Sequence, residues 1–179
     1  FDTGDVGILH PDGTLQLMGK SPRPRGMFAP NRRFYLCYAD RDRLRAGWMD
    51  AQGRVLVRIN SLGLREREEV IGPKPAGQQR ILCLGDSFTF GWGVPEELGW
   101  VRLLEDELRA EGRDVRTVNC GAAGTICVDE YQWGLEHRFG KLDPDAVIVT
   151  ICLNDLVPSN GLFLENGEPP PDTGLRSLD

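Results

Sequence analysis

The sequence predicts an α/β protein in which helices cover a parallel sheet, preceded by an irregular or β-rich segment. From Arg80 onward, apolar strand-like runs alternate with amphipathic helical segments at the spacing of βαβ units, and this alternation specifies a parallel sheet. Before that point, short strand-like runs are separated by turns and show no long helical period. We therefore expect a lead-in segment at residues 1–78 and an α/β domain at residues 79–179.

The α/β domain is expected to open with a strand, a helix and a second strand. The unbroken apolar run at 81–84 predicts a strand that is buried on both faces. Apolar residues on one side of 96–110 predict an amphipathic helix, which Gly112 ends. The next strand is expected at 115–119.

A second helix and a third strand extend the predicted sheet. Apolar residues at helical spacing give this helix a buried stripe, formed by Val128, Tyr131, Leu135 and Phe139. Residues 145–151 form the third apolar run and predict a strand. The tail at 158–179 is rich in Pro, Gly and acidic residues, and we expect a loop or lid there.

The composition argues against nucleic acid as a partner and against a membrane span. The 179 residues are 40% hydrophobic, enough for one packed core, and the net charge of -6 provides no positive field for phosphate groups. One basic cluster, Arg23, Arg25, Arg32 and Arg33, lies in a Pro/Gly-rich stretch and is expected to be a solvated loop. No apolar run reaches the roughly 18 residues of a membrane span. The chain begins with Phe1 and carries no signal-peptide pattern, so the sequence assigns no compartment.

The cysteines indicate neither a disulfide framework nor a metal site. Their number, five, is odd, and none belongs to a Cys-x-x-Cys pair. No cluster of His, Cys and acidic residues has ligand spacing, so we expect no metal and no cofactor. Three cysteines within or beside predicted strands are expected to pack as small hydrophobic residues: Cys83, Cys120 and Cys152.

Polar and glycine residues follow each of the three predicted strands. Gly85-Asp86-Ser87-Phe88 places a serine at a strand-to-helix turn, where its backbone N–H suits an oxyanion. Residues 119–125 follow the second strand, and their small side chains let backbone amides approach a ligand closely. Asn154 and Asp155 follow the third strand and offer a side-chain amide as donor. Because the carboxyl ends of parallel strands meet at one edge, we expect these groups to lie close together.

Taken in order, the three clusters resemble the first three signature blocks of the SGNH/GDSL hydrolases. The matching residues are 80–89, Val118-Asn119 with Gly124-Thr125, and Leu153-Asn154-Asp155, and the resemblance covers roughly residues 79–160. It implies a flavodoxin-like α/β/α sandwich, incomplete at the C-terminus of this chain. It also implies cleavage of carboxylic esters of lipids, acylated sugars or small molecules.

The resemblance assigns roles to individual residues. Ser87 is the expected nucleophile, and the Gly124 amide and the Asn154 carboxamide are expected to join the Ser87 amide in an oxyanion hole. Asp86 is expected to hold Ser87 in its turn, and direct participation of its carboxylate in the chemistry is the other interpretation. The remaining candidates for substrate binding are Asp155 and the aromatic pair Phe88 and Trp92, for which core packing is the competing interpretation.

Two features depart from the family pattern. Cys152 stands where the third block normally opens with glycine, and we expect it to narrow the site or displace Asn154. The fourth block, Asp-x-x-His, has no match, and His10 and His137 are expected to be a loop residue and a surface or half-buried helix residue. A serine hydroxyl is a weak nucleophile without a base. We therefore expect little turnover from the 179-residue chain alone and activity from a longer chain that supplies Asp-x-x-His.

Parts of the lead-in segment carry resemblances of their own. Residues 28–31 and 59–65 look like the segment before the hydrolase block in some family members. We expect them to pack against the sheet edge, with Asn60 and Arg65 fixing the loop. Residues 3–7, together with Asp12-Gly13 and Gly19-Lys20, are similar to a segment of adenylate-forming enzymes, which a Thr-Gly-Asp turn followed by a β-hairpin explains equally well.

Two other functions compete with a hydrolase of small-molecule esters or acylated carbohydrates. A non-catalytic carbohydrate- or acyl-binding domain keeps the sheet and pocket without a complete catalytic triad. A phosphate or nucleotide binder uses residues 85–87 as its loop, but no P-loop lysine and no GxGxxG pattern follows the strand. An Asp-x-x-His downstream of the third block separates the first two functions.

Overall fold

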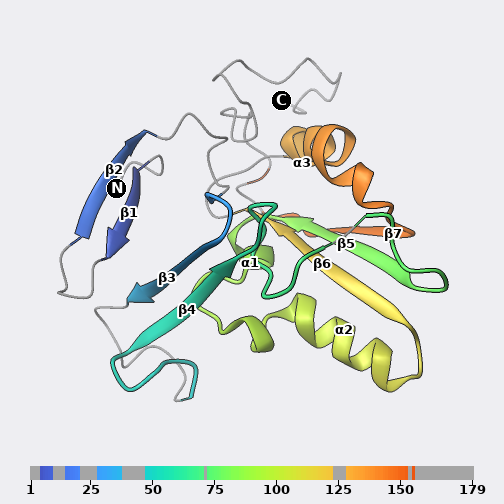
Figure 1. The fold of residues 1–179 in the computed structure, drawn as a ribbon, viewed down its shortest axis with the longest axis horizontal. Helices are drawn as coiled ribbons and strands as arrows, with labels where there is room; N and C mark the ends of the chain where they lie inside the picture. The colour runs from blue at the N-terminus through green and yellow to red at the C-terminus, as the bar shows by residue number, and fades with distance from the viewer. Residues whose placement is uncertain are drawn as a thin grey trace.

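The lead-in segment contains two antiparallel strand pairs (Figure 1). The computed structural model describes residues 5–9, 15–20, 28–37, 47–70, 72–122, 128–152 and 155. In the first pair β1 (Asp5–Leu9) lies beside β2 (Leu15–Lys20), and in the second β3 (Arg32–Cys37) lies beside β4 (Arg54–Ile59). The strand-like runs that the sequence shows before residue 78 are therefore strands, and β1 and β2 form the antiparallel pair that a β-hairpin requires.

One face of the β3–β4 pair packs into an apolar cluster. Alternate residues of β4 are buried, and Val57 and Ile59 share a cluster with Phe90 and Phe34. Arg32 and Arg33 are exposed, but they open β3 and do not lie in a loop. The expectation of a loop was wrong for these two residues, because an exposed strand accepts charged side chains as readily as a turn does. Arg23 and Arg25 lie outside the described residues.

The α/β domain is built on a parallel sheet with the order β6-β5-β7. These strands are β5 (Gln79–Gly85), β6 (Val115–Gly121) and β7 (Ala146–Val149). Leu82 of β5 pairs with Val118 on one side and with Val147 on the other. The predicted α/β class is thus confirmed, and this order, second strand, first strand, third strand, begins the order 2-1-3-4-5 of flavodoxin-like sheets.

The helices alternate with the strands of this sheet. They are α1 (Ser87–Phe90), the 3-10 turn Glu96–Leu98, α2 (Trp100–Ala110), and α3 (Val128–Gly134) with its π-helical continuation Leu135–Phe139 and the 3-10 turn Gly140–Leu142. The predicted helix at 96–110 is divided at Gly99, whose backbone is extended and precedes the first turn of α2. The single helical turn α1 has no apolar period of its own in the sequence.

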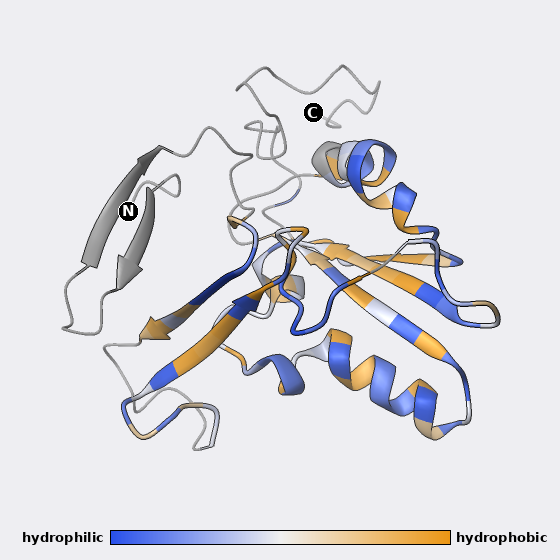
Figure 2. Ribbon diagram, in the orientation of Figure 1, coloured by the Kyte–Doolittle hydropathy of each residue, from blue (hydrophilic) through white to orange (hydrophobic). Residues whose placement is uncertain are grey.

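Helices cover both faces of the sheet, α3 on one side and α2 on the other (Figure 1). The three strands carry the most hydrophobic stretches of the domain, whereas α2 alternates polar and apolar residues (Figure 2). The core under α3 includes Leu82 and Leu84 of β5, Val118 of β6, and Tyr131 and Phe139 of the predicted stripe. The amphipathic pattern of the second helix is therefore confirmed.

The end of the lead-in segment packs into the same core. Leu64 and Val70 are buried with the strands of the sheet. The Asn60 Oδ1 accepts hydrogen bonds from the amides of Leu62 at 2.9 Å and Leu64 at 3.1 Å, which fixes the loop after β4. The expected role of Asn60 in this loop is confirmed.

Two of the cysteines behave as core residues. Cys83 and Cys120 are fully buried free thiols. Burial raises the pKa of Cys83 to about 12, so this thiol stays neutral. Cys152 is only half-buried, since it lies beyond the end of β7 at the edge of the sheet. In the part of the chain that the structure describes, no helix has the length and apolarity to cross a membrane.

Candidate active site

Ser87 lies where the central strand of the described sheet ends. β5 ends at Gly85, Asp86 caps the following turn, and Ser87 is the first residue of α1. The buried Asp86 carboxylate accepts a hydrogen bond from the Phe88 amide at 2.9 Å, so the turn-holding bond expected from the sequence is present. Ser87 is half-buried, and its hydroxyl forms no hydrogen bond with any residue that the structure describes. Among the described residues, none therefore engages the Ser87 hydroxyl.

The end of β7 holds α1 from one side. The hydroxyls of Thr89 and Thr150 share a hydrogen bond, and the Thr150 amide donates to the Leu84 carbonyl at 3.0 Å. A Cβ atom at Gly85 would collide with both hydroxyls. Glycine is therefore required before the serine turn because α1 and β7 leave no space for a side chain.

The end of β6 holds α1 from the other side. The Asn119 Nδ2 donates to the Thr89 carbonyl at 2.9 Å, while the Asn119 Oδ1 accepts from the Gly121 amide at 3.0 Å. A Cβ atom at Gly121 would come within 2.6 Å of the Thr89 carbonyl carbon, so the backbones of β6 and α1 are in direct contact. Asn119 thus orients the turn of helix that begins with Ser87.

Two buried carboxylates, those of Asp86 and Asp155, act on the same neighbouring side chains. Asp155 accepts a hydrogen bond from the Cys152 amide at 2.7 Å and is almost fully buried, as is Asp86. Burial raises the pKa of the buried Tyr131, and the carboxylates of Asp155 and Asp86 raise it further. Burial and the same two carboxylates also raise the pKa of Cys152. Asp86 and Asp155 therefore both lie near a neutral phenol and a neutral thiol that the sequence analysis did not place there.

β6 and β7, the strands that precede Gly124 and Asn154 in the sequence, end at the same edge of the sheet. Gly121 pairs with Gly85, and the Ala122 amide donates to the Gly85 carbonyl at 3.0 Å. β7 runs parallel to β5 and ends at the Thr150 bond to Leu84. Gly124 and Asn154 themselves lie outside the described residues, so their part in an oxyanion hole stays a prediction.

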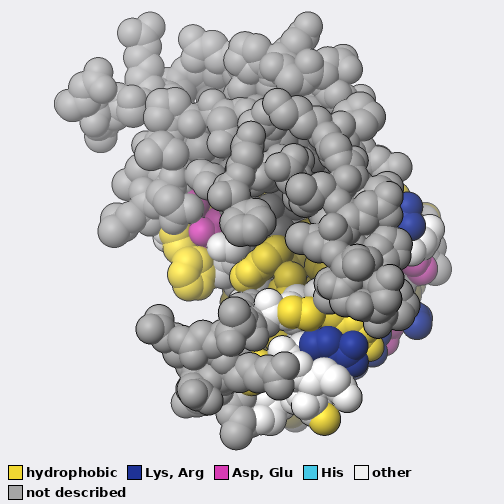
Figure 3. Space-filling view, turned by 90° about the vertical axis from the view of Figure 1, so that its left-hand side faces the viewer, with side chains coloured by type: hydrophobic (Ala, Val, Ile, Leu, Met, Phe, Trp, Pro, Cys, Tyr) yellow, Lys and Arg dark blue, Asp and Glu magenta, His cyan; other side chains and the backbone are white. Residues whose placement is uncertain are grey.

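The aromatic candidates lie at the surface. The Phe88 side chain is 71% exposed and Trp92 is 47% exposed. The Trp92 ring rests 5.9 Å from the buried ring of Phe90, measured between centroids. On the face drawn in Figure 3, hydrophobic side chains gather near the centre with basic groups beside them. The exposed ring of Phe88, the residue after Ser87, thus offers apolar surface at the serine turn.

His137 is a surface residue, as expected. Its side chain is exposed, its ring stacks on Trp133 with centroids 4.8 Å apart, and its Nδ1 donates to the Trp133 carbonyl at 3.0 Å. These contacts stay within α3 and its continuation. His10 lies outside the described residues.

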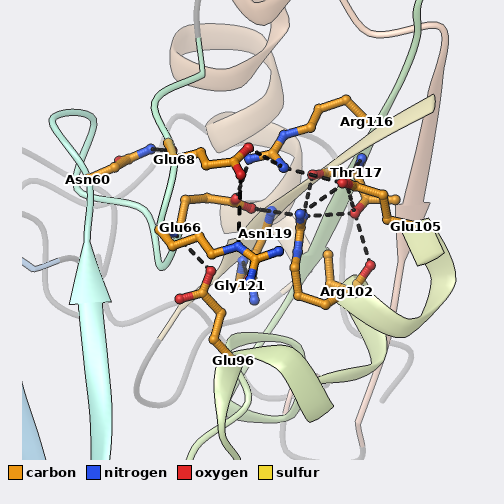
Figure 4. Close-up of polar contacts among 12 residues, drawn as sticks. Asn60, Glu66, Glu68, Glu96, Arg102, Glu105, Arg116, Thr117, Asn119 and Gly121 are labelled. Carbon is orange, nitrogen blue, oxygen red and sulfur yellow. Dashed lines mark hydrogen bonds and ion pairs between the residues drawn. The ribbon is translucent and has the colours of Figure 1, made fainter. Parts of the chain in front are cut away.

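A buried ionic cluster under α2 was not found from the sequence (Figure 4). We use this name for Glu66, Arg102, Glu105, Arg116 and Thr117. Glu66 contacts Arg102 at 3.3 Å and Arg116 at 2.8 Å, and Glu105 contacts Arg102 at 3.0 Å. The Thr117 amide donates to Glu105 at 2.6 Å. The signal was the i, i+3 spacing of Arg102 and Glu105 beside Val101, on the side of the helix that packs against the sheet.

The two acids of this cluster differ in their pKa. Burial raises the pKa of Glu66 to about 7, against the opposing pull of Arg102 and Arg116. Burial also raises the pKa of Glu105, but Arg102 and the Thr117 amide outweigh it, so this pKa lies below its ordinary value. Glu66 is therefore the member of the cluster that changes its charge near neutral pH.

Comparison with known proteins gives several matches. Residues 83–177 match the model of the GDSL-like Lipase/Acylhydrolase family. The chain is 36% identical over 80 residues to an arylesterase of Vibrio mimicus, which covers 43% of this chain and 38% of that protein. It is 38% identical over 55 residues to esterase TesA of Pseudomonas aeruginosa, which covers 31% of this chain and 27% of TesA.

A solved structure is also similar. AlinE4, an SGNH-hydrolase family esterase, is 26% identical with a TM-score of 0.40, and the match covers 46% of this chain and 44% of that chain. The chain thus spans well under half the length of the curated relatives it matches.

Proposed function

This chain belongs to the GDSL-like lipase/acylhydrolase family, a family of ester hydrolases, and we propose that Ser87 is the nucleophile with which it cleaves carboxylic esters. The observation that carries the proposal is the placement of Ser87 at the carboxyl end of β5, with a half-buried hydroxyl that no described residue engages. In open α/β sheets this edge is where ligands bind. We further propose that residues 79–179 belong to the catalytic domain.

The proposed reaction is attack of the Ser87 Oγ on the ester carbonyl carbon. A base takes the hydroxyl proton and passes it to the alcohol oxygen as the C–O bond to the alcohol breaks, and water then releases the acid from the acyl-serine. Negative charge grows on the carbonyl oxygen during the attack. The proposed donors to that oxygen are the Ser87 amide, the Gly124 amide and the Asn154 carboxamide, and loss of one such donor typically costs about 10²-fold in rate.

The proposed substrates are small-molecule esters or acylated carbohydrates. The exposed rings of Phe88 and Trp92 offer apolar surface to an acyl group beside the serine turn. Asp86 and Asp155 complete the proposed binding region, Asp86 chiefly by capping α1. An arylesterase and an esterase among the relatives support an ester rather than an amide or phosphate substrate.

The test is hydrolysis of p-nitrophenyl acetate by the full-length gene product and its Ser87→Ala variant. We expect the substitution to lower kcat/KM by at least about 10³-fold, as loss of a serine nucleophile does. Ser61→Ala is the matched control, because Ser61 is exposed in the loop after β4 and bonds to Glu69. The proposal would be contradicted if the Ser87→Ala variant hydrolysed the ester as fast as the wild type. It would also be contradicted if the wild-type protein bound the ester without hydrolysing it.

The 179-residue chain is expected to be nearly inactive by itself. His137 faces Trp133 at the surface, and a serine hydroxyl needs a base. Assay of this chain beside the full-length gene product checks the expectation. Comparable turnover by the two would show that a base lies within the 179 residues.

A further inference from the structure

The helix that carries Ser87 is too short to hold itself in place. α1 has four residues, and a single turn leaves its last carbonyls without helical partners. Its own bonds are few: the Phe90 amide donates to the Asp86 carbonyl at 2.9 Å, and the Gly91 and Trp92 amides both donate to the Ser87 carbonyl at 3.0 Å. The position of Ser87 therefore depends on whatever binds the end of this turn.

Arg65 of the lead-in segment binds that end. Its guanidinium donates to the carbonyls of Phe90 at 2.9 Å, of Gly91, and of Val94 at 2.5 Å. Its side chain is almost fully buried and lies over the Phe90 ring, with 5.2 Å between the guanidinium carbon and the ring centroid. A planar fork of fixed donors matches several carbonyls at once, and a positive charge is favourable at a helix C-terminus.

Gly91 makes room for this guanidinium. Its φ of +80° is the left-handed conformation that ends a helix, and a Cβ atom there would lie 2.9 Å from the Arg65 Nη1. The Gly91 carbonyl accepts from Arg65, while the Gly91 amide donates to the Ser87 carbonyl. Arg65 is therefore connected to Ser87 through a single residue.

The next residue of the lead-in segment fixes the other contact to α1. The Glu66 carboxylate accepts from the Asn119 amide at 2.7 Å, and the Asn119 carboxamide donates to the Thr89 carbonyl at 2.9 Å. Glu66 is itself held by Arg102 and Arg116 (Figure 4). Two successive residues thus secure the same helical turn by separate routes.

We propose that Arg65 is a positioning residue for catalysis, which holds the turn Ser87–Phe90 so that the Ser87 hydroxyl keeps its orientation toward the ester. The inference rests on the proposed function of Ser87. It assigns a role in the reaction to the lead-in segment, because Arg65 precedes residues 83–177, which match the family model. Arg65 touches neither substrate nor reacting atoms and acts through the carbonyls of α1.

The first test compares Arg65→Lys with Arg67→Lys in the full-length gene product. Lysine keeps the charge of Arg65 but loses the fork that binds three carbonyls, whereas the Arg67 side chain is exposed. With p-nitrophenyl acetate, we expect R65K to lower kcat by about 10-fold to 10²-fold, because small displacements of reacting groups have effects of this size. KM is expected to change by less than about two-fold, since no substrate contact is removed. R67K is expected to keep both constants.

The second test measures the amide hydrogen exchange rates of α1 and of the residues that follow it. In R65K the amides of Gly91 and Trp92 are expected to exchange at least about 10-fold faster than in the wild type, while the amides of β5 keep their protection. A merely structural role for Arg65 predicts instead a uniform loss of protection across β5 and α1. An unchanged kcat in R65K, or such a uniform loss, would overturn the proposal.

Two further outcomes are informative. If R65K does not fold, amide exchange in the wild-type protein tests the proposal by itself. A held turn requires that the amides of Gly91 and Trp92 be as protected as those of β5, and rapid exchange of these two amides would contradict the proposal. Should Ser87→Ala leave ester hydrolysis intact, the proposed function fails, but the exchange at Gly91 and Trp92 still shows whether Arg65 holds α1.

Discussion

The two faces of the parallel sheet are packed by different chemistry. Under α3, Leu82, Leu84 and Val118 meet Tyr131 and Phe139 in an apolar core. Under α2, the buried ionic cluster joins that helix and the lead-in segment to β6 through charged hydrogen bonds. Apolar contacts are not directional, whereas ion pairs and hydrogen bonds fix geometry. The face that needs exact geometry is the one whose contacts reach Asn119 and the serine turn.

The largest expected effect comes from breaking the ionic face at its centre. Glu66→Ala leaves the buried Arg102 and Arg116 with only Glu105 as a buried carboxylate between them, which we expect to lower the free energy of unfolding by about 3–5 kcal/mol. Urea unfolding followed by circular dichroism measures this. Glu68→Ala is the control: Glu68 also contacts Arg116, at 3.3 Å, but its side chain is 62% exposed, so the expected loss is below about 1 kcal/mol. Equal losses in the two variants would contradict the assignment of Glu66 as the central group.

The apolar face is expected to respond to loss of volume. Leu82 is completely buried, and Leu82→Ala is expected to lower the free energy of unfolding by about 3 kcal/mol through lost burial and a cavity. The same urea titration measures it, with Leu103→Ala on the exposed side of α2 expected to stay within about 0.5 kcal/mol. A loss in Leu82→Ala no larger than that of Leu103→Ala would show that this face is loosely packed.

The smallest expected effect is a dependence of the free energy of unfolding on pH, which arises from the ionic face and not from the apolar face. Because the pKa of Glu66 in the folded chain is about 7, above its ordinary value of 4.5, the folded state holds this proton more tightly than the unfolded state. The resulting stabilisation is fully present below the ordinary pKa and is lost as the pH rises through about 7. From about pH 5 to about pH 6.5, the contribution should fall by about 2 kcal/mol.

Glu66→Gln isolates this titration, because glutamine keeps the shape and cannot lose a proton. We expect the free energy of unfolding of the wild type to fall relative to that of Glu66→Gln across this interval. Leu82→Ala, which alters only the apolar face, should keep the wild-type slope. Parallel curves for the wild type and Glu66→Gln would place the titration elsewhere.

The apolar face was predictable from the sequence and the ionic face was not. The strand at 81–84 and the stripe of Tyr131 and Phe139 follow from hydrophobic runs and helical spacing, which report burial directly. Arg102 and Glu105 carry charges that normally face solvent, so hydrophobic spacing gives no sign of their burial. Their burial depends on Glu66 and Arg116, which come from other segments of the chain.

The candidate site was also predicted only in part, because some of its contacts join segments that are far apart in the sequence. The turn at Asp86 and Ser87 is local and follows from the residue order after β5. Arg65 and Phe90, whose carbonyl it binds, are 25 residues apart in the sequence, and sequence spacing alone does not reveal such a contact. The expectation that Arg65 fixes a loop was correct in kind, but the segment it binds is the serine turn.

The close contact between Gly91 and Arg65 couples substitutions at these two positions. The guanidinium of Arg65 fills the space beside Gly91, so alanine at 91 displaces it as well as straining the backbone. Once lysine stands at 65, that displacement has already happened, and the two substitutions together should cost less than their sum. Along diverging lineages, loss of Arg65 then removes the steric reason to keep glycine at 91, whereas the φ of +80° still favours glycine there.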